Sequence, residues 1–136
     1  MPLLGAPAIN PRYHFLAGNR AMLPASLVVM LAAGFGEETV ARGYLFERLG
    51  KLLGHRVGAK IKIVLLSSGL FAGAHYFDQG VPGVEQAAIT GMVFGTIFAI
   101  TGRIFPLMLA HAAFDLTAVA MIYWNIEHKV AHLFFK

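Results

Sequence analysis

Six ionisable side chains of this sequence stand within or beside long apolar stretches, where an ionisable group is costly to bury and usually marks a functional site. Carboxylate and imidazole groups exchange protons readily, so a cluster of them can carry out acid–base chemistry. Whether they form one cluster depends on their spacing and on the elements that carry them. The six residues are Glu37, Glu38, Arg42, His75, His111 and Asp115.

The first of these residues combine an ion pair with a second carboxylate. Glu38 and Arg42 are four residues apart, so on a helix they can pair along one face. Glu37 points about 100° away from Glu38, because an α-helix has 3.6 residues per turn. The arginine can therefore neutralise one carboxylate while Glu37 faces a cavity.

Two further apolar segments repeat this four-residue spacing. His111 and Asp115 share a face of the last apolar segment. Phe71 and His75 share a face of the second. An ion pair or a histidine near a helix end can be a packing contact, but packing does not require a buried pair in mid-segment. We therefore expect the three polar faces to turn toward one another and form one cluster.

Such a cluster supports two forms of peptide-bond hydrolysis. A carboxylate beside an imidazole can take a proton from water, while the second imidazole stabilises the tetrahedral oxyanion. Alternatively, two histidines and a carboxylate can hold a zinc ion with one open position. In that case His75, His111 and Asp115 are the candidate ligands, and another carboxylate is the base. The residues alone leave both forms open.

Other protease chemistries find less support in the sequence. No HExxH motif is present, and the chain has no cysteine to act as a nucleophile or a metal ligand. A Ser68–His111 dyad lacks the glycine that is expected two residues before the serine. Asp78 and Asp115 are the only aspartates, and Asp78 falls in a predicted turn, which argues against an aspartyl dyad.

The composition indicates that the solvent of this chain is a lipid bilayer. Of its 136 residues, 57% are hydrophobic and only 13% are charged, about half the charged share of a soluble domain. The net charge of +4 comes from basic residues that mostly flank the apolar segments. No stacking motif or long basic run supports nucleic-acid binding, so we expect no nucleic-acid partner.

Four apolar segments are separated by turn-forming residues. A spanning helix needs about 20 residues, and only the last segment reaches this length without polar neighbours. Tight turns are expected around Gly80 and Pro82 and at Gly102, and a basic connector over residues 49–62. The predicted fold is all-α, a polytopic membrane helix bundle of about four transmembrane or partly re-entrant helices. The segments cover residues 21–36, 63–77, 84–101 and 104–124.

Three short motifs carry the six ionisable residues. The first is EExxxR at residues 37–42, the second is FxxxH at residues 71–75, and the third is Hxxx followed by Asp at residues 111–115. With these motifs in this order on separate apolar segments, the sequence resembles the CPBP family of intramembrane proteases. The name stands for CAAX prenyl endopeptidases and bacteriocin-processing enzymes, and the family is also called Abi. The resemblance covers residues 34–118, most of the chain.

The resemblance implies an intramembrane endopeptidase that hydrolyses a peptide bond of a membrane-associated peptide or protein. Glu37 would be the base that activates water, with assistance from His75. Glu38 and Arg42 would orient the site, and Phe71 would support it. The implied partners are such a substrate and the lipid bilayer.

For His111 and Asp115 the resemblance implies either oxyanion stabilisation or metal binding. The family is often called a metalloprotease family, but a metal-free, glutamate-dependent mechanism is also argued for its CAAX members. Zinc or another divalent metal is therefore one expectation, and a metal-free site is the other. Many members have asparagine at the position of Asp115, and a carboxylate there donates a hydrogen bond to an oxyanion only when it is protonated.

We divide the chain into three parts on this basis. Residues 1–20 carry three prolines and little apolar continuity, and form a lead-in segment. Residues 21–124 form the intramembrane protease core, and residues 125–136 form a tail at the membrane interface. We expect an integral membrane protein, in a prokaryotic plasma membrane.

Two hypotheses of other classes remain. The small size of the chain is compatible with a catalytically silent membrane partner, such as a bacteriocin self-immunity protein, that keeps the family fold. Ionisable residues inside a membrane also line proton or ion pathways. A pathway of this kind would use Glu37, His75, His111 and Asp115.

Overall fold

The computed structural model describes residues 11–134, with side chains as far as residue 130. Within these residues every regular element is helical and no strand occurs. The predicted all-α architecture is thus confirmed. Residues 1–10 of the lead-in segment and 135–136 of the tail lie outside the described residues.

Three helical stretches are long and apolar enough to cross a membrane: Arg20–Leu53, Val57–Thr101 and Phe105–Tyr123. Their outward faces carry large apolar side chains, among them Val28 and Phe77, that are exposed in the isolated chain. In water such a surface would promote aggregation, whereas lipid tails are as apolar as these side chains. The exterior therefore matches a lipid environment, as the composition predicts.

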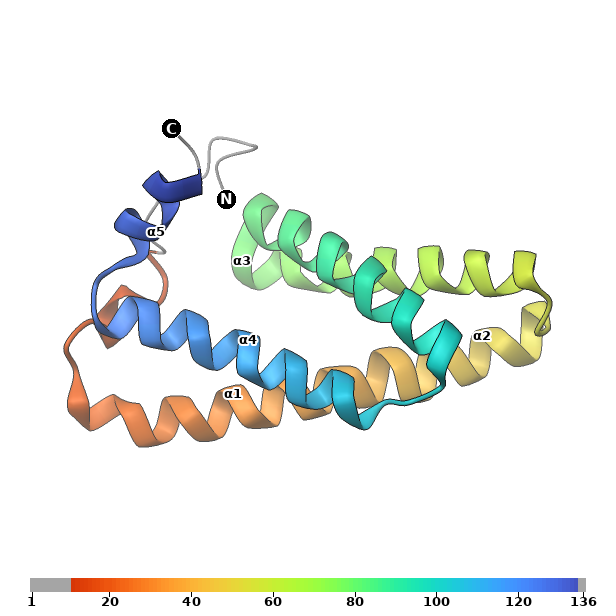
Figure 1. The fold of residues 1–136 in the computed structure, drawn as a ribbon, viewed down its shortest axis with the longest axis horizontal. Coiled ribbons are helices and arrows are strands. Elements are labelled where there is room, and N and C mark those ends of the chain that lie inside the picture. The colour runs from red at the N-terminus through yellow and green to blue at the C-terminus, as the bar shows by residue number, and fades with distance from the viewer. Residues whose placement is uncertain (1–10, 135–136) are drawn as a thin grey trace.

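The first spanning stretch is one continuous rod (Figure 1). It consists of α1 (Leu23–Glu38), the π-helix η4 (Thr39–Leu45) and α2 (Phe46–Leu53). Pro24 lies in the first turn of α1, where its missing N–H removes no intrahelical hydrogen bond. The wider turns of η4 follow directly after the two glutamates, so the local geometry changes at the predicted site.

The basic connector after this rod is shorter than predicted. The helix ends at Gly54, whose φ of 86° is readily adopted by glycine. Residues 54–56 therefore form the connector, in place of the expected 49–62. Gly50 falls within the predicted connector, whereas it lies inside α2 and makes room for the His55 ring, which a Cβ would approach to 3.3 Å.

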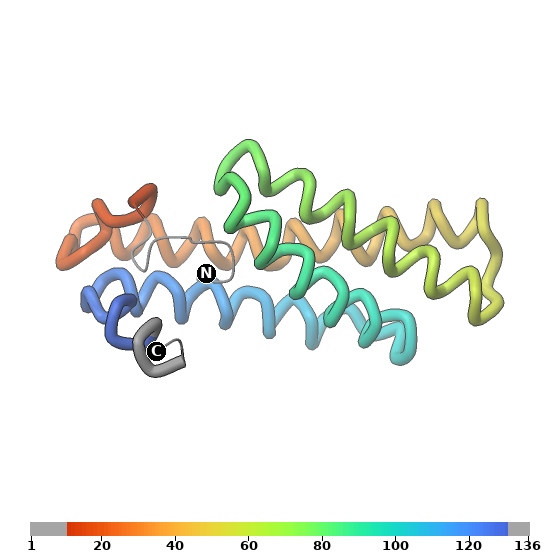
Figure 2. Tube along the Cα trace, turned by 90° about the horizontal axis from the view of Figure 1, so that it is seen from above, coloured from red at the N-terminus to blue at the C-terminus, as the bar shows by residue number. Residues whose placement is uncertain are grey.

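The second spanning stretch, α3 (Val57–Thr101), folds back on itself. At Gly80 the backbone leaves the helix with φ 64° and ψ −158°, and Pro82 follows two residues later. Figure 2 shows the resulting two arms, which meet at this bend and diverge from it. The second and third predicted segments are these two arms. The predicted turn is confirmed, and the four apolar segments lie in the first rod, in the two arms of α3 and in α4.

The third spanning helix, α4 (Phe105–Tyr123), runs beside α1 (Figure 1). A turn at Gly102, with φ 64°, leads into it as predicted. The two helices lie in close contact at Gly34, where an added Cβ would lie 2.7 Å from the main-chain nitrogen of Ala112. Only glycine permits this approach, which brings the glutamates of α1 to the level of His111.

The described part of the lead-in segment packs against the bundle. Leu16 is buried in a small apolar cluster with Val119 and Ile122 of α4. Tyr13 and Met30 pack against the same cluster. The segment therefore covers one end of the α1–α4 pair. The remaining short elements are η2 (His14–Leu16), η3 (Arg20–Met22) and α5 (Glu127–Phe134).

Candidate active site

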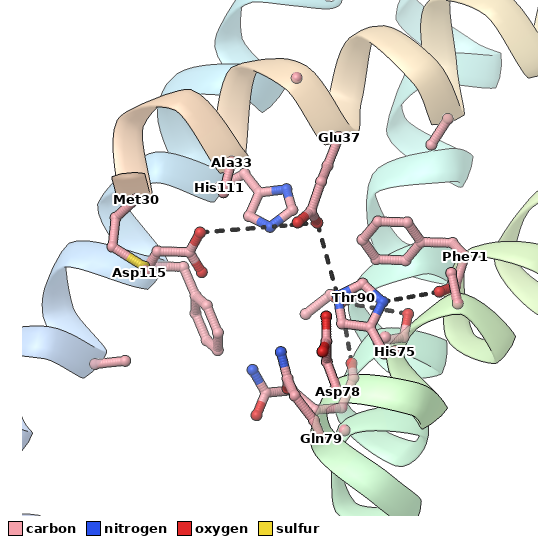
Figure 3. A pocket seen from close by; sticks show the side chains of 18 of the residues that line it. Met30, Ala33, Glu37, Phe71, His75, Asp78, Gln79, Thr90, His111 and Asp115 are labelled. Carbon is pink, nitrogen blue, oxygen red and sulfur yellow. Dashed lines mark hydrogen bonds and ion pairs between the residues drawn. The ribbon is translucent and has the colours of Figure 1, made fainter. Parts of the chain in front are cut away.

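The three predicted polar faces turn toward one another around a single cavity. It has a volume of about 640 Å³ and lies where α1 and η4 meet α3 and α4. Figure 3 shows the side chains that reach it from these helices. Of the predicted residues, Glu37, Phe71, His75, His111 and Asp115 line the cavity, whereas Glu38 and Arg42 are buried beside it.

Glu38 is the most deeply buried ionisable side chain among the described residues, with no exposed surface. Its Oε1 accepts a hydrogen bond from Arg42 Nη1 (2.7 Å) and another from His111 Nδ1 (2.8 Å). Arg42 is 2% exposed, and its Nη2 donates to the main-chain carbonyl of Gly91 (3.1 Å). The predicted pair thus forms, and it joins the first rod to both α3 and α4.

Two phenyl rings enclose this ion pair. The guanidinium carbon of Arg42 lies 5.1 Å from the ring centroid of Phe71 and 5.7 Å from that of Phe94. Both rings also make edge contacts with the imidazole of His111. Aromatic faces attract a cation at these distances. The rings therefore help to stabilise a guanidinium from which water is excluded.

Glu37 faces the cavity instead. Its side chain is 38% exposed, yet its Oε2 atom is buried and has no hydrogen-bond partner in the described part of the chain. This oxygen lies 3.7 Å from His75 Nε2 and 3.6 Å from His111 Nε2. Both distances exceed that of a direct hydrogen bond. The two adjacent glutamates thus face in different directions, as their spacing predicts.

The protonated nitrogen of each histidine follows from its Nδ1 contact. His75 Nδ1 lies 2.8 Å from the main-chain oxygen of Phe71, and His111 Nδ1 lies 2.8 Å from a Glu38 oxygen. A carbonyl and a carboxylate only accept hydrogen bonds, so each Nδ1 carries a proton. Each Nε2 is left facing Glu37, as an acceptor in the neutral ring and as a donor in the charged ring.

Asp115 enters the cluster through His111. Its Oδ2 lies 3.8 Å from His111 Nε2, one helical turn away on α4. This pair is looser than the Glu38–Arg42 pair, although the spacing in the sequence is the same. The imidazole of His111 therefore has carboxylates near both ring nitrogens: Glu38 at Nδ1, and Glu37 and Asp115 at Nε2.

The sequence of this chain matches a known protein family. Residues 19–117 match the family described as Type II CAAX prenyl endopeptidase Rce1-like. The chain belongs to this family. All six ionisable residues lie within the matched region. Comparison with curated proteins and with solved structures finds no match.

Membership of the Rce1-like family gives a coarse assignment of activity. It is a family of CAAX proteases, so the chain is a hydrolase of the membrane with a peptide or protein as its substrate. The resemblance drawn from the three motifs is confirmed. The three apolar helices agree with a membrane location.

A bound metal ion would require at least three of these side chains to converge on one point. Among the described residues, no group of three or more His, Asp or Glu side chains is placed to hold one. Glu37 Oε2 lies 3.7 Å from His75 Nε2 and 3.6 Å from His111 Nε2, and Asp115 Oδ2 lies 3.8 Å from His111 Nε2. We therefore derive no catalytic step through a metal.

The two dyads that the sequence disfavours do not form in the described structure. Ser68 Oγ has no hydrogen-bond partner there, and Ser68 packs against Gly91, where a Cβ would lie 3.2 Å from the serine Cβ. Asp78 pairs with Arg12 and not with Asp115. Of the arrangements weighed from the sequence, the carboxylate–imidazole cluster is the one that the structure assembles.

Two features of the site were not predicted. The π-helix begins at Thr39, whose Oγ1 donates to the carbonyl of Phe35 (2.8 Å), and π turns occur often at functional sites. Gln79, Gln86 and Thr90 add a polar wall to the cavity. Gln86 and Thr90 are four residues apart in an apolar segment, a spacing that could have indicated a shared polar face.

Proposed function

We propose that the chain is an intramembrane endopeptidase in which Glu37 activates a water molecule for attack on a peptide bond. One observation carries the proposal: Glu37 Oε2 has no hydrogen-bond partner among the described residues and lies within 3.7 Å of Nε2 of both His75 and His111. Three convergent polar atoms can hold a water, and a cavity of about 640 Å³ has room for a peptide.

In this mechanism the Glu37 carboxylate removes a proton from water as the water oxygen attacks the peptide carbonyl carbon. The new C–O bond gives a tetrahedral intermediate that carries a negative oxygen. When the C–N bond breaks, the proton held by Glu37 passes to the leaving amine, so protons and charge balance. His75 assists from Nε2, while its Nδ1–H holds the ring on the carbonyl of Phe71.

His111 and Asp115 are the residues that would stabilise the oxyanion. As an imidazolium, His111 donates from Nε2 while its Nδ1–H stays on Glu38. Asp115 donates when it carries a proton. Glu38 and Arg42 act as positioning residues, because Glu38 holds His111 and Arg42 holds Glu38.

We infer that the site works without a bound metal, because its donors are not grouped as ligands in the described residues. A zinc-dependent site would require His75, His111 and Asp115 to close around one ion. Elemental analysis of the purified protein, combined with a cleavage assay in the presence of a chelator, tests this. Stoichiometric zinc that is lost together with activity would contradict the metal-free mechanism.

Single substitutions test the proposal on the purified chain in lipid nanodiscs, with a mixture of quenched fluorescent peptides as substrate. Glu37→Gln, His75→Ala and His111→Ala should each abolish cleavage. Glu47→Gln is the matched control, since Glu47 is an exposed glutamate that pairs with Lys51 (2.6 Å). Full activity of all three site variants would overturn the proposal. A biological effect that survives Glu37→Gln would point to a silent membrane partner.

A further inference from the structure

The far edge of the cavity carries a carboxylate that the proposed reaction does not use. Asp78 lies near the end of the first arm of α3, and Asp78 and Gln79 come three and four residues after His75. Side chains at these spacings share a helix face. Figure 3 shows Asp78 and Gln79 at the cavity on the same arm as His75.

The local sequence gives Asp78 a second acceptor besides its carboxylate. In an uninterrupted helix the N–H of residue 82 would donate to the carbonyl of Asp78. Pro82 has no N–H, and the helix is already broken at Gly80, where φ is 64°. The carbonyl oxygen of Asp78 is therefore left for another donor. It also belongs to the last carbonyls of a helical arm, which carry partial negative charge.

A guanidinium already occupies both acceptors. Arg12 of the lead-in segment places Nη2 3.0 Å from Asp78 Oδ1, and its Nη1 donates to the main-chain oxygen of Asp78. Two donors in a rigid fork match two adjacent acceptors, which is the contact that arginine makes and lysine does not reproduce. Asp78 is thus built as a site for a guanidinium.

The residues that follow Arg12 enter the same cavity. Tyr13 and Leu16 both line it, and Leu16 is buried against Val119 and Ile122. An arginine on Asp78 and an apolar side chain four residues later therefore occupy the two ends of a short peptide stretch.

The charge of the cavity favours the same kind of ligand. Its described lining residues include the carboxylates of Glu37, Asp78 and Asp115, but no lysine or arginine. A cleft lined by one sign of charge attracts the opposite sign and disfavours its own. A peptide with a basic residue is therefore preferred over an acidic one.

We propose that Asp78 is a specificity-determining residue that binds an arginine of the substrate peptide, and that Arg12–Asp78 is the contact which this arginine displaces. The assignment of the ligand as a substrate rests on the proposed function. The arginine and aspartate side chains of this contact are 52% and 71% exposed. Exposed ion pairs contribute little stability, so a competing guanidinium can replace Arg12.

Binding measurements test this independently of cleavage. The protein is the full chain with Glu37→Gln in nanodiscs, and the probe is a fluorescent pentapeptide RYHFL, which copies residues 12–16. Its partner is QYHFL, and fluorescence anisotropy gives both Kd values. The arginine peptide should bind about three- to fivefold more tightly, the range expected for an exposed ion pair.

Two variants assign the preference to Asp78. Asp78→Asn should abolish the difference between RYHFL and QYHFL, whereas Glu47→Gln, which neutralises an exposed glutamate of α2, should preserve it. Arg12→Gln should tighten binding of RYHFL about threefold, because the competing guanidinium is gone. This variant leaves α3 unaltered, so it keeps the test valid even if the change at Asp78 disturbs folding.

The outcomes separate the two proposals. Equal binding of RYHFL and QYHFL, a preference that survives Asp78→Asn, or no tightening in Arg12→Gln overturns the assignment of Asp78. Cleavage by the parent chain without any arginine preference would overturn it and leave the protease proposal intact. An arginine preference that depends on Asp78, without cleavage of any peptide, supports the guanidinium site and overturns the protease proposal.

Discussion

Glu37 and Glu38 are neighbours in the sequence and identical in chemistry, yet they lie in opposite environments. Glu38 has no exposed surface, and its Oε1 accepts hydrogen bonds from Arg42 and His111. Glu37 is 38% exposed, and its Oε2 has no hydrogen-bond partner within residues 11–134. Glu38 Oε2 also lacks a partner there, but Glu38 Oε1 holds Arg42 and His111 in place, whereas Glu37 makes no direct hydrogen bond and can accept a proton.

The same contrast separates two regions: the buried ion pair of Glu38 and Arg42, and the cavity wall with Glu37, His75, His111 and Asp115. Beside the cavity, a buried ion pair is enclosed by phenyl rings, and removal of one partner of such a pair costs about 3–5 kcal/mol. At the cavity wall the ionisable groups are 3.6–3.8 Å apart, and their side chains are 12–38% exposed. Substitutions in the first region should therefore lower stability, and those in the second should lower activity.

The largest effect is expected from Glu37→Gln. Loss of a general base should lower kcat by about 10²- to 10⁴-fold. The free energy of unfolding should change by no more than about 0.5 kcal/mol, because the carboxylate makes no direct hydrogen bond to lose. Peptide cleavage and denaturant titration of the same preparation measure the two quantities. A loss of stability that matches the loss of activity would contradict the contrast.

Arg42→Met should give the opposite result. It leaves the fully buried Glu38 without its cation, so the free energy of unfolding should fall by about 3–5 kcal/mol. Adding Glu38→Leu should recover part of this loss, because the buried charge goes with its partner while His111 Nδ1 loses its acceptor. Unfolding in mixed micelles compares the single and double variants. A double variant as unstable as the single one would show that the region is not held by this ion pair.

Gly34→Ala should affect both regions at an intermediate level. The added Cβ would lie 2.7 Å from the main-chain nitrogen of Ala112, and overpacking of this kind costs about 1–3 kcal/mol. Because the clash pushes α1 from α4, it should also lower kcat by displacing His111. Gly69→Ala is the control, since no described atom lies within 4 Å of a Cβ there. Equal kcat and stability in both variants would contradict the role of this contact.

The smallest effect is expected from Asp115→Asn. Asparagine can donate a hydrogen bond to the oxyanion without taking up a proton, so kcat should stay within about fivefold of the parent value. Steady-state cleavage over a range of substrate concentrations gives kcat and KM separately. A loss of about a hundredfold would show that the carboxylate itself is required, as in a metal site.

Much of the architecture could be predicted because it follows from local patterns. The turns at Gly80 and Gly102 are confirmed, and each predicted apolar segment falls on a helical stretch, although the first stretch continues to Leu53 and not to residue 36. Gly50 was misjudged, because whether a glycine ends a helix depends on its neighbours in space. There, a histidine ring from the next loop occupies the room that a side chain would need.

The contacts of the site could be predicted where both residues lie on the same helical stretch. Glu38 and Arg42 pair as their spacing predicts, and His111 and Asp115 come near each other in the same way. The hydrogen bond between Glu38 and His111 was missed, because it joins two helices. Its register is set by the close approach of Gly34 to α4, which no spacing within one segment reveals.

The π-helix η4 separates the rod into two parts with different helical phase. A π turn takes up about one residue more than an α turn, and one residue corresponds to a rotation of about 100°. Phe46, the first residue of α2, packs its ring on Phe98 of α3 with centroids 5.1 Å apart. The π-helix therefore sets the angle around the rod between the glutamates of α1 and the face of α2 that packs on α3. Gain or loss of one residue within η4 would turn one part of the rod while the other keeps its partners.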